Sequence, residues 1–256
     1  MNENLAPGLW RETVRVRVFE TGPDGLLTPA ALMNRLQDAA AVHATALSFG
    51  GPDLGPRGLA WVLVRLSLRI EGQVRAGETL DIRTWPCRPE TRRAGRNFLV
   101  HSESGETLAR AATDWMIIDA VKRAMVHIPP DLAVRVPEDV PPPLAVEAAT
   151  PPRLAEAGHE ALMHVRRADL DENGHANNVR YLEWALEALP DELIAGHRLV
   201  AADLSFRAEA RRGQGVQSLC AVETDGEGFT AIHGLRRADD GRELARVLTS
   251  WTRKDG

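Results

Sequence analysis

The sequence predicts an α+β protein made of two copies of one unit, each a helix combined with an antiparallel sheet. Three observations lead to this prediction. Segments with strand-type alternation far outnumber helical segments, a proline-rich stretch divides the chain near its middle, and the order of elements before that stretch recurs after it. The 256 residues are enough for two such units.

The first half begins with an alternating segment that predicts a strand at residues 13–20. Thr28 and Pro29 then supply an N-cap and a first-turn proline for a helix. Its apolar residues recur at helical spacing to residue 46, and Gly50-Gly51 is expected to end it. Because this helix is apolar from residue 32 to 47, we expect it to be covered on most sides. Four strands are predicted to follow, at residues 59–70, 78–85, 97–102 and 108–119.

The middle of the chain is a predicted linker. Residues 129–152 hold half of the 16 prolines, a composition typical of a stiff, extended segment. The predicted domains are therefore residues 1–128 and 156–256, joined by a linker at 129–155. In the second half we predict a strand at residues 161–168, a polar loop, a helix at 178–189 and strands at 199–210, 216–223, 229–237 and 243–253.

The repeat is also visible in the residues themselves. GETLAR at residues 105–110 matches GRELAR at 241–246, and the same interval separates Trp115 from Trp251. LSLR at 66–69 matches LSFR at 204–207 at an interval two residues longer. A single helix wrapped by an antiparallel sheet is the hotdog fold, so the predicted architecture is a tandem (double) hotdog. Pairing the two sheets edge to edge would remove an exposed edge strand.

Composition excludes several functional classes. With 44% hydrophobic and 26% charged residues we expect an ordinary core, and with a net charge of −5 we expect no nucleic-acid partner. No apolar run is long enough to span a bilayer, and the N-terminus lacks the pattern of a signal peptide. Cys87 and Cys220 have no metal or redox spacing. We therefore expect a cytoplasmic protein without membrane association, metal or cofactor.

The polar loop of the second half combines three functional groups. Asp171, Asn173 and His175 place a carboxylate, an amide and an imidazole at two-residue spacing, which in an extended turn would aim them the same way. Asn177 and Asn178 follow where the helix is expected to begin. Backbone N–H groups at that helix start suit an oxyanion.

Simpler interpretations of the loop remain open at this point. Such residues often form only a turn and a cap, and His175 could simply hydrogen-bond a carbonyl. The loop from Asp169 also fits the first six positions of a calcium-binding EF-hand, but its twelfth position is Arg180 instead of the required Glu. Tyr181 and Trp184 are expected in the core.

Three motifs carry a resemblance to a known family. They are DLDENGHANNVRYLEW at residues 169–184, LSFRAEA at 204–210, and GETL at 77–80 followed by Thr84-Trp85. With them the chain resembles the acyl-acyl carrier protein thioesterases, the plant-type fatty-acyl family and its bacterial relatives. The resemblance implies hydrolysis of the thioester of fatty acyl-acyl carrier protein, which would be substrate and partner. Its active-site positions fall on Asp171, Asn173, His175 and Glu209.

The chain departs from that family at several positions. Ala210 stands where the family has a cysteine, which excludes a thiol nucleophile at this position and favours carboxylate and water chemistry. Gly174 and Ala176 replace the Gln and Val usual in plant members. Strand alternation alone would place Glu209 on an exposed face, paired with Arg207.

The first copy lacks the polar loop. It has GPDGLL at residues 22–27 instead, so one active site per chain is expected, in the second half. By the resemblance, the first half would supply a tunnel for the acyl chain, lined from residues 32–47 and 59–70.

Four arginines, Arg88, Arg92, Arg93 and Arg96, are predicted to cluster in one loop. Such a cluster is usually a solvated face. The functional alternative is docking of an acidic carrier protein.

Other functions also fit the sequence. They are a hotdog acyl-CoA thioesterase, a hydratase or dehydratase of enoyl or hydroxyacyl thioesters, and a non-catalytic acyl-binding module. The acyl chain length, the preference between carrier protein and CoA, and assembly as a homodimer are left open by the sequence.

Overall fold

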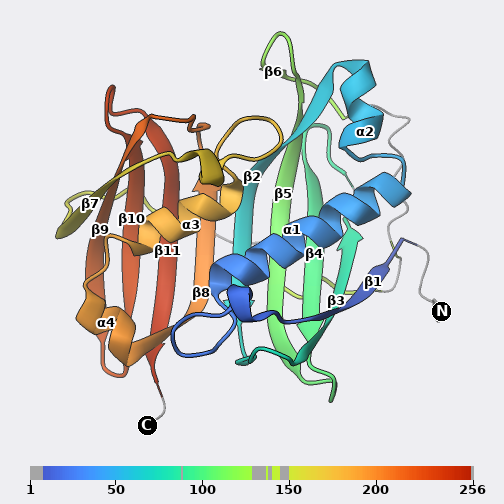
Figure 1. The fold of residues 1–256 in the computed structure, drawn as a ribbon. Helices are drawn as coiled ribbons and strands as arrows, with labels where there is room; N and C mark the ends of the chain where they lie inside the picture. The colour runs from blue at the N-terminus through green and yellow to red at the C-terminus, as the bar shows by residue number, and fades with distance from the viewer. Residues whose placement is uncertain (1–7, 88, 129–136, 138–139, 145–149, 255–256) are drawn as a thin grey trace. The chain divides into compact units, whose positions relative to one another are not determined.

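The structure, a computed structural model, describes residues 8–87, 89–128, 137, 140–144 and 150–254. The chain divides into two compact units, Met1–Val64 with Ile70–Glu147 and Arg65–Arg69 with Ala148–Gly256 (Figure 1). Most of the predicted linker lies outside the described residues, and the predicted domain boundaries stay a prediction.

The first unit is an antiparallel sheet with one long helix. Its strands lie in the order β1-β3-β4-β5-β2, and β6 pairs with β5. The strands are β1 (Trp10–Arg15), β2 (Leu59–Ile70), β3 (Thr79–Pro86), β4 (Ala94–His101), β5 (Thr107–Asp119) and β6 (Ala124–Met125). The helices are η1 (Val18–Glu20), α1 (Pro29–Ala46), α2 (Gly51–Leu54) and η2 (Gly55–Arg57).

The second unit repeats this plan. Its strands lie in the order β8-β11-β10-β9-β7, and Arg65–Arg69 of β2 pair antiparallel with β8. The strands are β7 (His159–His164), β8 (His197–Phe206), β9 (Gly215–Asp225), β10 (Gly228–Arg237) and β11 (Glu243–Arg253). The helices are η3 (Arg167–Asp169), α3 (Asn178–Leu186) and α4 (Asp191–Gly196). When β7 is matched to β1, the strand order of the two units is the same, which confirms the repeat predicted from the sequence.

Each unit forms its core between one helix and one face of its own sheet (Figure 1). In the first unit α1 begins after Thr28, whose hydroxyl accepts the N–H of Ala31, and its buried side chains pack on the sheet. In the second unit α3 contacts β9, β10 and β11. A fully buried leucine such as Leu182 contributes about 1.5–3 kcal/mol.

Some predicted boundaries and one predicted packing arrangement are wrong. Residues 18–20 form a 3-10 turn instead of continuing the first strand, and the N–H of Arg17 donates to the Glu20 carboxylate at the start of this turn. The second-half helix ends at Leu186, and α4 follows Pro190. Helix α1 is buried on one side only, since residues such as Asp38 on its other side are exposed.

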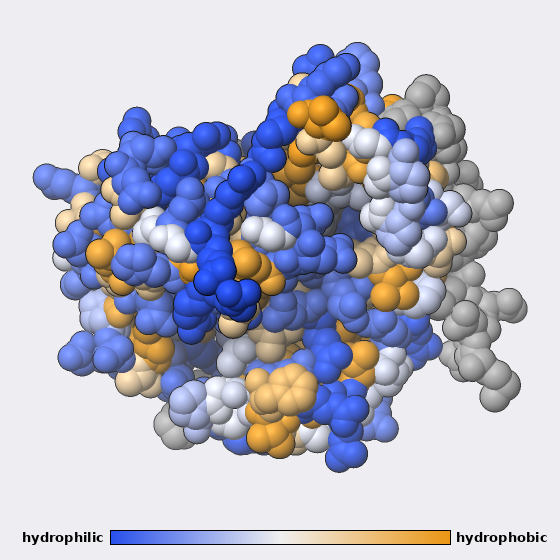
Figure 2. Space-filling model, turned by 45° about the horizontal axis from the view of Figure 1, so that its top comes forward, coloured by the Kyte–Doolittle hydropathy of each residue, from blue (hydrophilic) through white to orange (hydrophobic). Residues whose placement is uncertain are grey.

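The described surface is mostly polar. Figure 2 shows a largely hydrophilic face on which apolar residues are scattered. The most exposed large apolar side chains are Phe19 and Val121, at 86% and 87%. Among the described residues, no helix has the length and apolar character needed to cross a membrane.

Two buried histidines give this fold a defined acid sensitivity. His43 on α1 and His233 on β10 are 3% and 0% exposed, and burial lowers the pKa of each from 6.5 to about 4. The unfolded chain binds a proton at each ring near pH 6.5, whereas the folded protein does so only near pH 4. We therefore expect the free energy of unfolding to fall as the pH drops from 6.5 to 4, by up to roughly 3 kcal/mol per ring.

Denaturant unfolding across this pH range measures the slope. His233→Gln should flatten it, whereas His159→Gln, at an exposed position of β7, serves as the control. An unchanged slope in His233→Gln would contradict the assignment.

Candidate active site

The predicted polar loop is a tight hairpin instead of an extended turn. The N–H of Asp171 donates to His175 O at 2.7 Å, and Gly174 N–H donates to Asp171 O at 3.1 Å. Gly174 has a φ of 74°, which favours glycine at this position. Oδ1 of Asp171 accepts the backbone N–H groups of Asn173 and His175 at 2.9 and 3.1 Å. The Asp171 carboxylate therefore holds the hairpin in shape.

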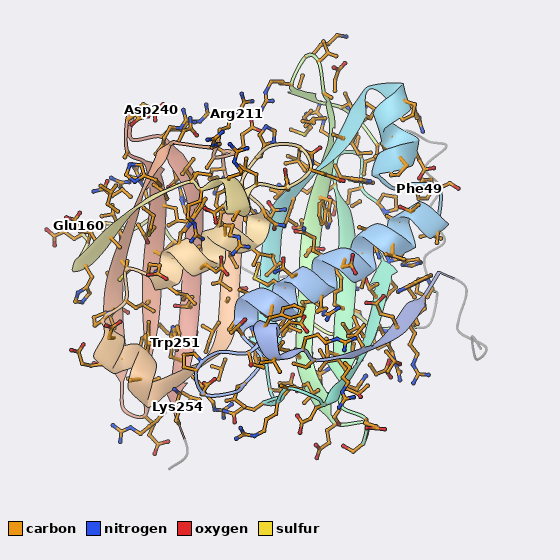
Figure 3. All side chains as sticks on the ribbon, in the orientation of Figure 1. Phe49, Glu160, Arg211, Asp240, Trp251 and Lys254 are labelled. Carbon is orange, nitrogen blue, oxygen red and sulfur yellow. The ribbon has the colours of Figure 1, made fainter. Side chains whose placement is uncertain are left out.

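The hairpin lies against the segment that follows β8. Ala176 N–H donates to Ala210 O at 2.9 Å, and His175 and Arg211 form a β-bridge. This register brings Nε2 of His175 to 3.0 Å from Oε2 of Glu209, two residues far apart in the sequence. Both side chains are about one-third exposed, at 27% and 31%, so the pair is open to a substrate. Figure 3 labels Arg211, the residue that forms the bridge with His175.

Strand alternation no longer sets the direction of the Glu209 side chain, because β8 ends at Phe206. Oε1 of Glu209 lies 3.4 Å from Nη2 of Arg211. A carboxylate only accepts hydrogen bonds, so the 3.0 Å contact favours the tautomer of His175 that carries its hydrogen on Nε2. In the neutral ring this leaves Nδ1 as a proton acceptor.

The other predicted site residues have different surroundings. Asn173 is exposed, and its side chain makes no hydrogen bond within the described chain. Asn177 caps α3 through Oδ1, but its own N–H donates to Asp169 O at 2.8 Å. The prediction that this N–H serves an oxyanion is therefore wrong. Asn178, the first residue of α3, has no acceptor for its N–H among the described residues, so it keeps that role as a candidate.

Asp169 anchors the base of the hairpin. It is fully buried and forms an ion pair with Arg166 at 2.8 Å, and Nε of Arg180 lies 3.8 Å away. Burial alone would raise the pKa of Asp169, but hydrogen bonds from the side chain and backbone of Arg166 lower it overall. A calcium ion would have to displace these guanidinium groups, which argues against the EF-hand interpretation.

Sequence reasoning placed Tyr181 in the core and missed its contact with the site. The hydroxyl of Tyr181 donates to Ala208 O at 3.0 Å and accepts Ala210 N–H at 2.9 Å, so it holds the backbone on both sides of Glu209. Burial raises the pKa of this hydroxyl to about 12, so it stays protonated. The signal was available, because a buried tyrosine needs a partner for its hydroxyl.

The first unit contains the same hairpin without its chemistry. Leu27 N–H donates to Val74 O at 2.8 Å, and Leu26 bridges Arg75. Leu26 thus stands where the second unit has His175, and Gln73 stands where it has Glu209. The imidazole–carboxylate pair is confined to the second unit.

The predicted arginine cluster is only partly supported. Arg88 lies outside the described residues, and Arg92 and Arg93 are exposed between β3 and β4. The prediction that Arg96 lies in the same loop is wrong. Arg96 is part of β4 and is buried, because its side chain points under α1 to His43.

Comparison with known proteins identifies the family. The family model for the acyl-ACP thioesterase N-terminal domain matches residues 8–135, and that for the C-terminal domain matches residues 153–253. The chain belongs to the acyl-ACP thioesterase family. The palmitoyl-acyl carrier protein thioesterase of Cuphea hookeriana is 28% identical over 97% of this chain. The chain spans 63% of the length of that relative.

Solved structures of the family support the predicted fold. The 12:0-ACP thioesterase from Umbellularia californica matches with a TM-score of 0.80 and 26% identity, over 96% of this chain and 94% of that one. An acyl-ACP thioesterase from Bacteroides thetaiotaomicron matches with a TM-score of 0.84 and 23% identity, over 95% and 98%. The tandem hotdog architecture is confirmed.

The two hydrogen bonds of the Tyr181 hydroxyl form a clamp on the backbone around Glu209, and their loss predicts a specific defect. Tyr181→Phe leaves Ala208 O and Ala210 N–H without their partner, which should cost about 1–2 kcal/mol of unfolding free energy. Because Glu209 lies between these two residues, we expect kcat for any reaction at this site to fall about tenfold with little change in KM.

The matched control is Trp184→Phe, in the same helix and in ring contact with Tyr181. It should lose stability without a comparable fall in kcat. If Tyr181→Phe keeps full kcat while folded, the clamp has no part in placing Glu209.

Proposed function

We propose that this protein hydrolyses the thioester of fatty acyl-acyl carrier protein and releases the free fatty acid. The observation that carries the proposal is the 3.0 Å contact between the side chains of His175 and Glu209, which are about one-third exposed. Membership of the acyl-ACP thioesterase family supports it. A cytoplasmic location and assembly as a homodimer stay predictions.

The pair is suited to activating water. In this scheme Glu209 accepts Nε2–H and fixes the tautomer, so Nδ1 of His175 takes a proton from water as the water oxygen attacks the thioester carbonyl carbon. The new C–O bond forms, the C–S bond breaks, and the proton passes from the imidazolium to the leaving thiolate. A positioned base of this kind contributes about a hundredfold to ten-thousandfold in rate.

The remaining groups of the hairpin have supporting roles in this scheme. The Asn178 N–H at the start of α3 would stabilise the oxyanion, a contribution of about a hundredfold or more. Asn173 would orient the substrate or the water with its exposed amide. Asp171 would act mainly by shaping the hairpin, because its Oδ1 already accepts two backbone N–H groups.

Two conservative variants distinguish the role of the Glu209 carboxylate from that of the Asp171 carboxylate. Glu209→Gln should lower kcat about a hundredfold or more, because a neutral amide stabilises the imidazolium less. Asp171→Asn keeps an oxygen for the same backbone bonds and should lose less than about tenfold. Release of free thiol measures hydrolysis and distinguishes it from hydration, which conserves the thioester.

Glu172→Gln, at an exposed position of the same hairpin, is the control and should keep full activity. A loss in Asp171→Asn as large as that in Glu209→Gln would make Asp171 the reacting carboxylate. An acyl-enzyme trapped in a single turnover would show direct attack by a carboxylate instead of by water.

A second prediction concerns the carrier protein. Arg92 and Arg93 are exposed and would face an acidic carrier. Changing both to Glu should raise KM for the acyl-carrier protein substrate and leave KM for a short acyl-CoA unchanged. Lys122→Glu with Arg253→Glu makes the same charge change at exposed positions elsewhere and serves as the control. Equal effects on both substrates would exclude docking at these arginines.

A further inference from the structure

Strand β7 is an edge strand of the second unit. Within the described residues it pairs with β9 alone, and its other side has no neighbouring strand. Its register with β9 is continuous from His159 to His164, and this segment contains no lysine and no proline. Edge strands commonly carry such residues or a bulge, because these features prevent pairing with another chain. The free side of β7 is therefore open to a further strand.

The hydrogen bonds to β9 determine which backbone groups of β7 are available. Val165 N–H donates to Gln214 O at 3.0 Å, so Val165 and every second residue before it direct their N–H and C=O groups to β9. The N–H and C=O groups of Glu160, Leu162 and His164 consequently point away from the sheet. All three side chains are exposed, and Leu162 is 65% exposed. Figure 3 labels Glu160 at this edge of the second unit.

These three residues are complementary to a second copy of themselves. When two β7 strands meet antiparallel around a two-fold axis at Leu162, each Leu162 lies opposite its own copy, and Glu160 lies opposite the partner's His164. In this register every outward-pointing N–H and C=O group of the three residues gains a partner. The Glu160 carboxylate can accept a hydrogen bond from the imidazole of the partner's His164, and the two leucines cover each other from water.

The matching strand of the first unit lacks this complementarity. Val16 N–H donates to the adjacent segment at 2.9 Å, as Val165 N–H does in the second unit, so the outward-pointing residues of β1 are Arg11, Thr13 and Arg15. The same two-fold pairing would place Arg11 opposite the partner's Arg15. Like charges directly opposite each other are destabilising, so β1 disfavours the pairing that β7 allows.

We propose that two copies of this chain form a dimer through β7, with the two strands antiparallel and the two-fold axis at Leu162. The sheet of each second unit then continues into that of its partner. A contact of one strand is small, so we expect a dimer that dissociates on dilution. Neither His175 nor Glu209 takes part in the contact, so this proposal and thioester hydrolysis can fail independently.

Disulfide trapping of the full chain tests the register. Leu162→Cys places two thiols at the axis, where the Cα atoms of a hydrogen-bonded pair lie about 5.5 Å apart, within the range of a disulfide. Mild oxidation should link this variant into a dimer on a non-reducing gel. Glu160→Cys alone should stay unlinked, because its copy lies about 14 Å away along the strands. A mixture of Glu160→Cys and His164→Cys should link.

Two controls exclude random collisions and the native thiols. Phe19→Cys carries a thiol at a position that is 86% exposed but far along the chain from β7, and it should stay unlinked. The wild type, in which Cys220 is buried and Cys87 is half-buried, should also stay unlinked.

Analytical ultracentrifugation measures the strength of the contact. Leu162→Asp should raise the Kd of the dimer about tenfold or more, because it places two carboxylates opposite each other. His164→Glu should raise it severalfold, and adding Glu160→Arg to this variant should restore it, because opposite charges then face each other again. Phe19→Asp is the control and should leave the Kd unchanged.

Three results would overturn the proposal. They are a wild type that stays monomeric at about 100 μM, a dimer whose Kd is unchanged in Leu162→Asp, and a Glu160→Cys variant that links to itself as readily as Leu162→Cys.

Discussion

The candidate site depends on one backbone hydrogen bond, from Ala176 N–H to Ala210 O. It aligns the hairpin with the segment after β8, and only in that register do His175 and Glu209 meet. The neighbouring hydrogen bonds all stabilise the same two segments, the hairpin and the segment after β8. Asp171 fixes the hairpin, Asp169 fixes its base, and Tyr181 fixes the opposite segment. The contact between the side chains of His175 and Glu209 is thus set by main-chain geometry.

The first unit shows that this framework exists apart from catalysis. It has the equivalent bond from Leu27 N–H to Val74 O, and Gly25 repeats the positive φ of Gly174 at the same 74°. The candidate site of the second unit therefore differs from the matching positions of the first by two side chains on a shared backbone. In the first unit those positions hold Leu26 and Gln73, neither of which can accept a proton from water at neutral pH.

The sequence predicted most elements of the fold because their signals are local. Strands β2 and β11 have the predicted bounds, and α1 begins where Thr28 and Pro29 indicated. The candidate residues of the hairpin were also found from its composition. The role of Tyr181 was missed because it depends on backbone atoms far away in the sequence.

Two of the errors share one physical origin, which is competition from tertiary contacts. The charge of Arg96 favours a position in a loop, but His43 and Thr84 provide acceptors that allow the side chain to be buried within a strand. The position of Asn177 at the start of a helix predicts a free backbone N–H, but this N–H donates to Asp169 O. Neither partner can be known before the fold is known.

The assignment of Arg65–Arg69 to the second unit has a consequence for dividing the chain. These five residues cover β8 along one side, and Arg69 binds both carboxylate oxygens of Asp203 at 3.1 and 2.9 Å. A fragment cut within the proline-rich segment would leave β8 as a bare edge strand with a solitary aspartate on it, an open template for aggregation. The half that contains the candidate site is thus not expected to be stable on its own, although it contains every side chain of that site.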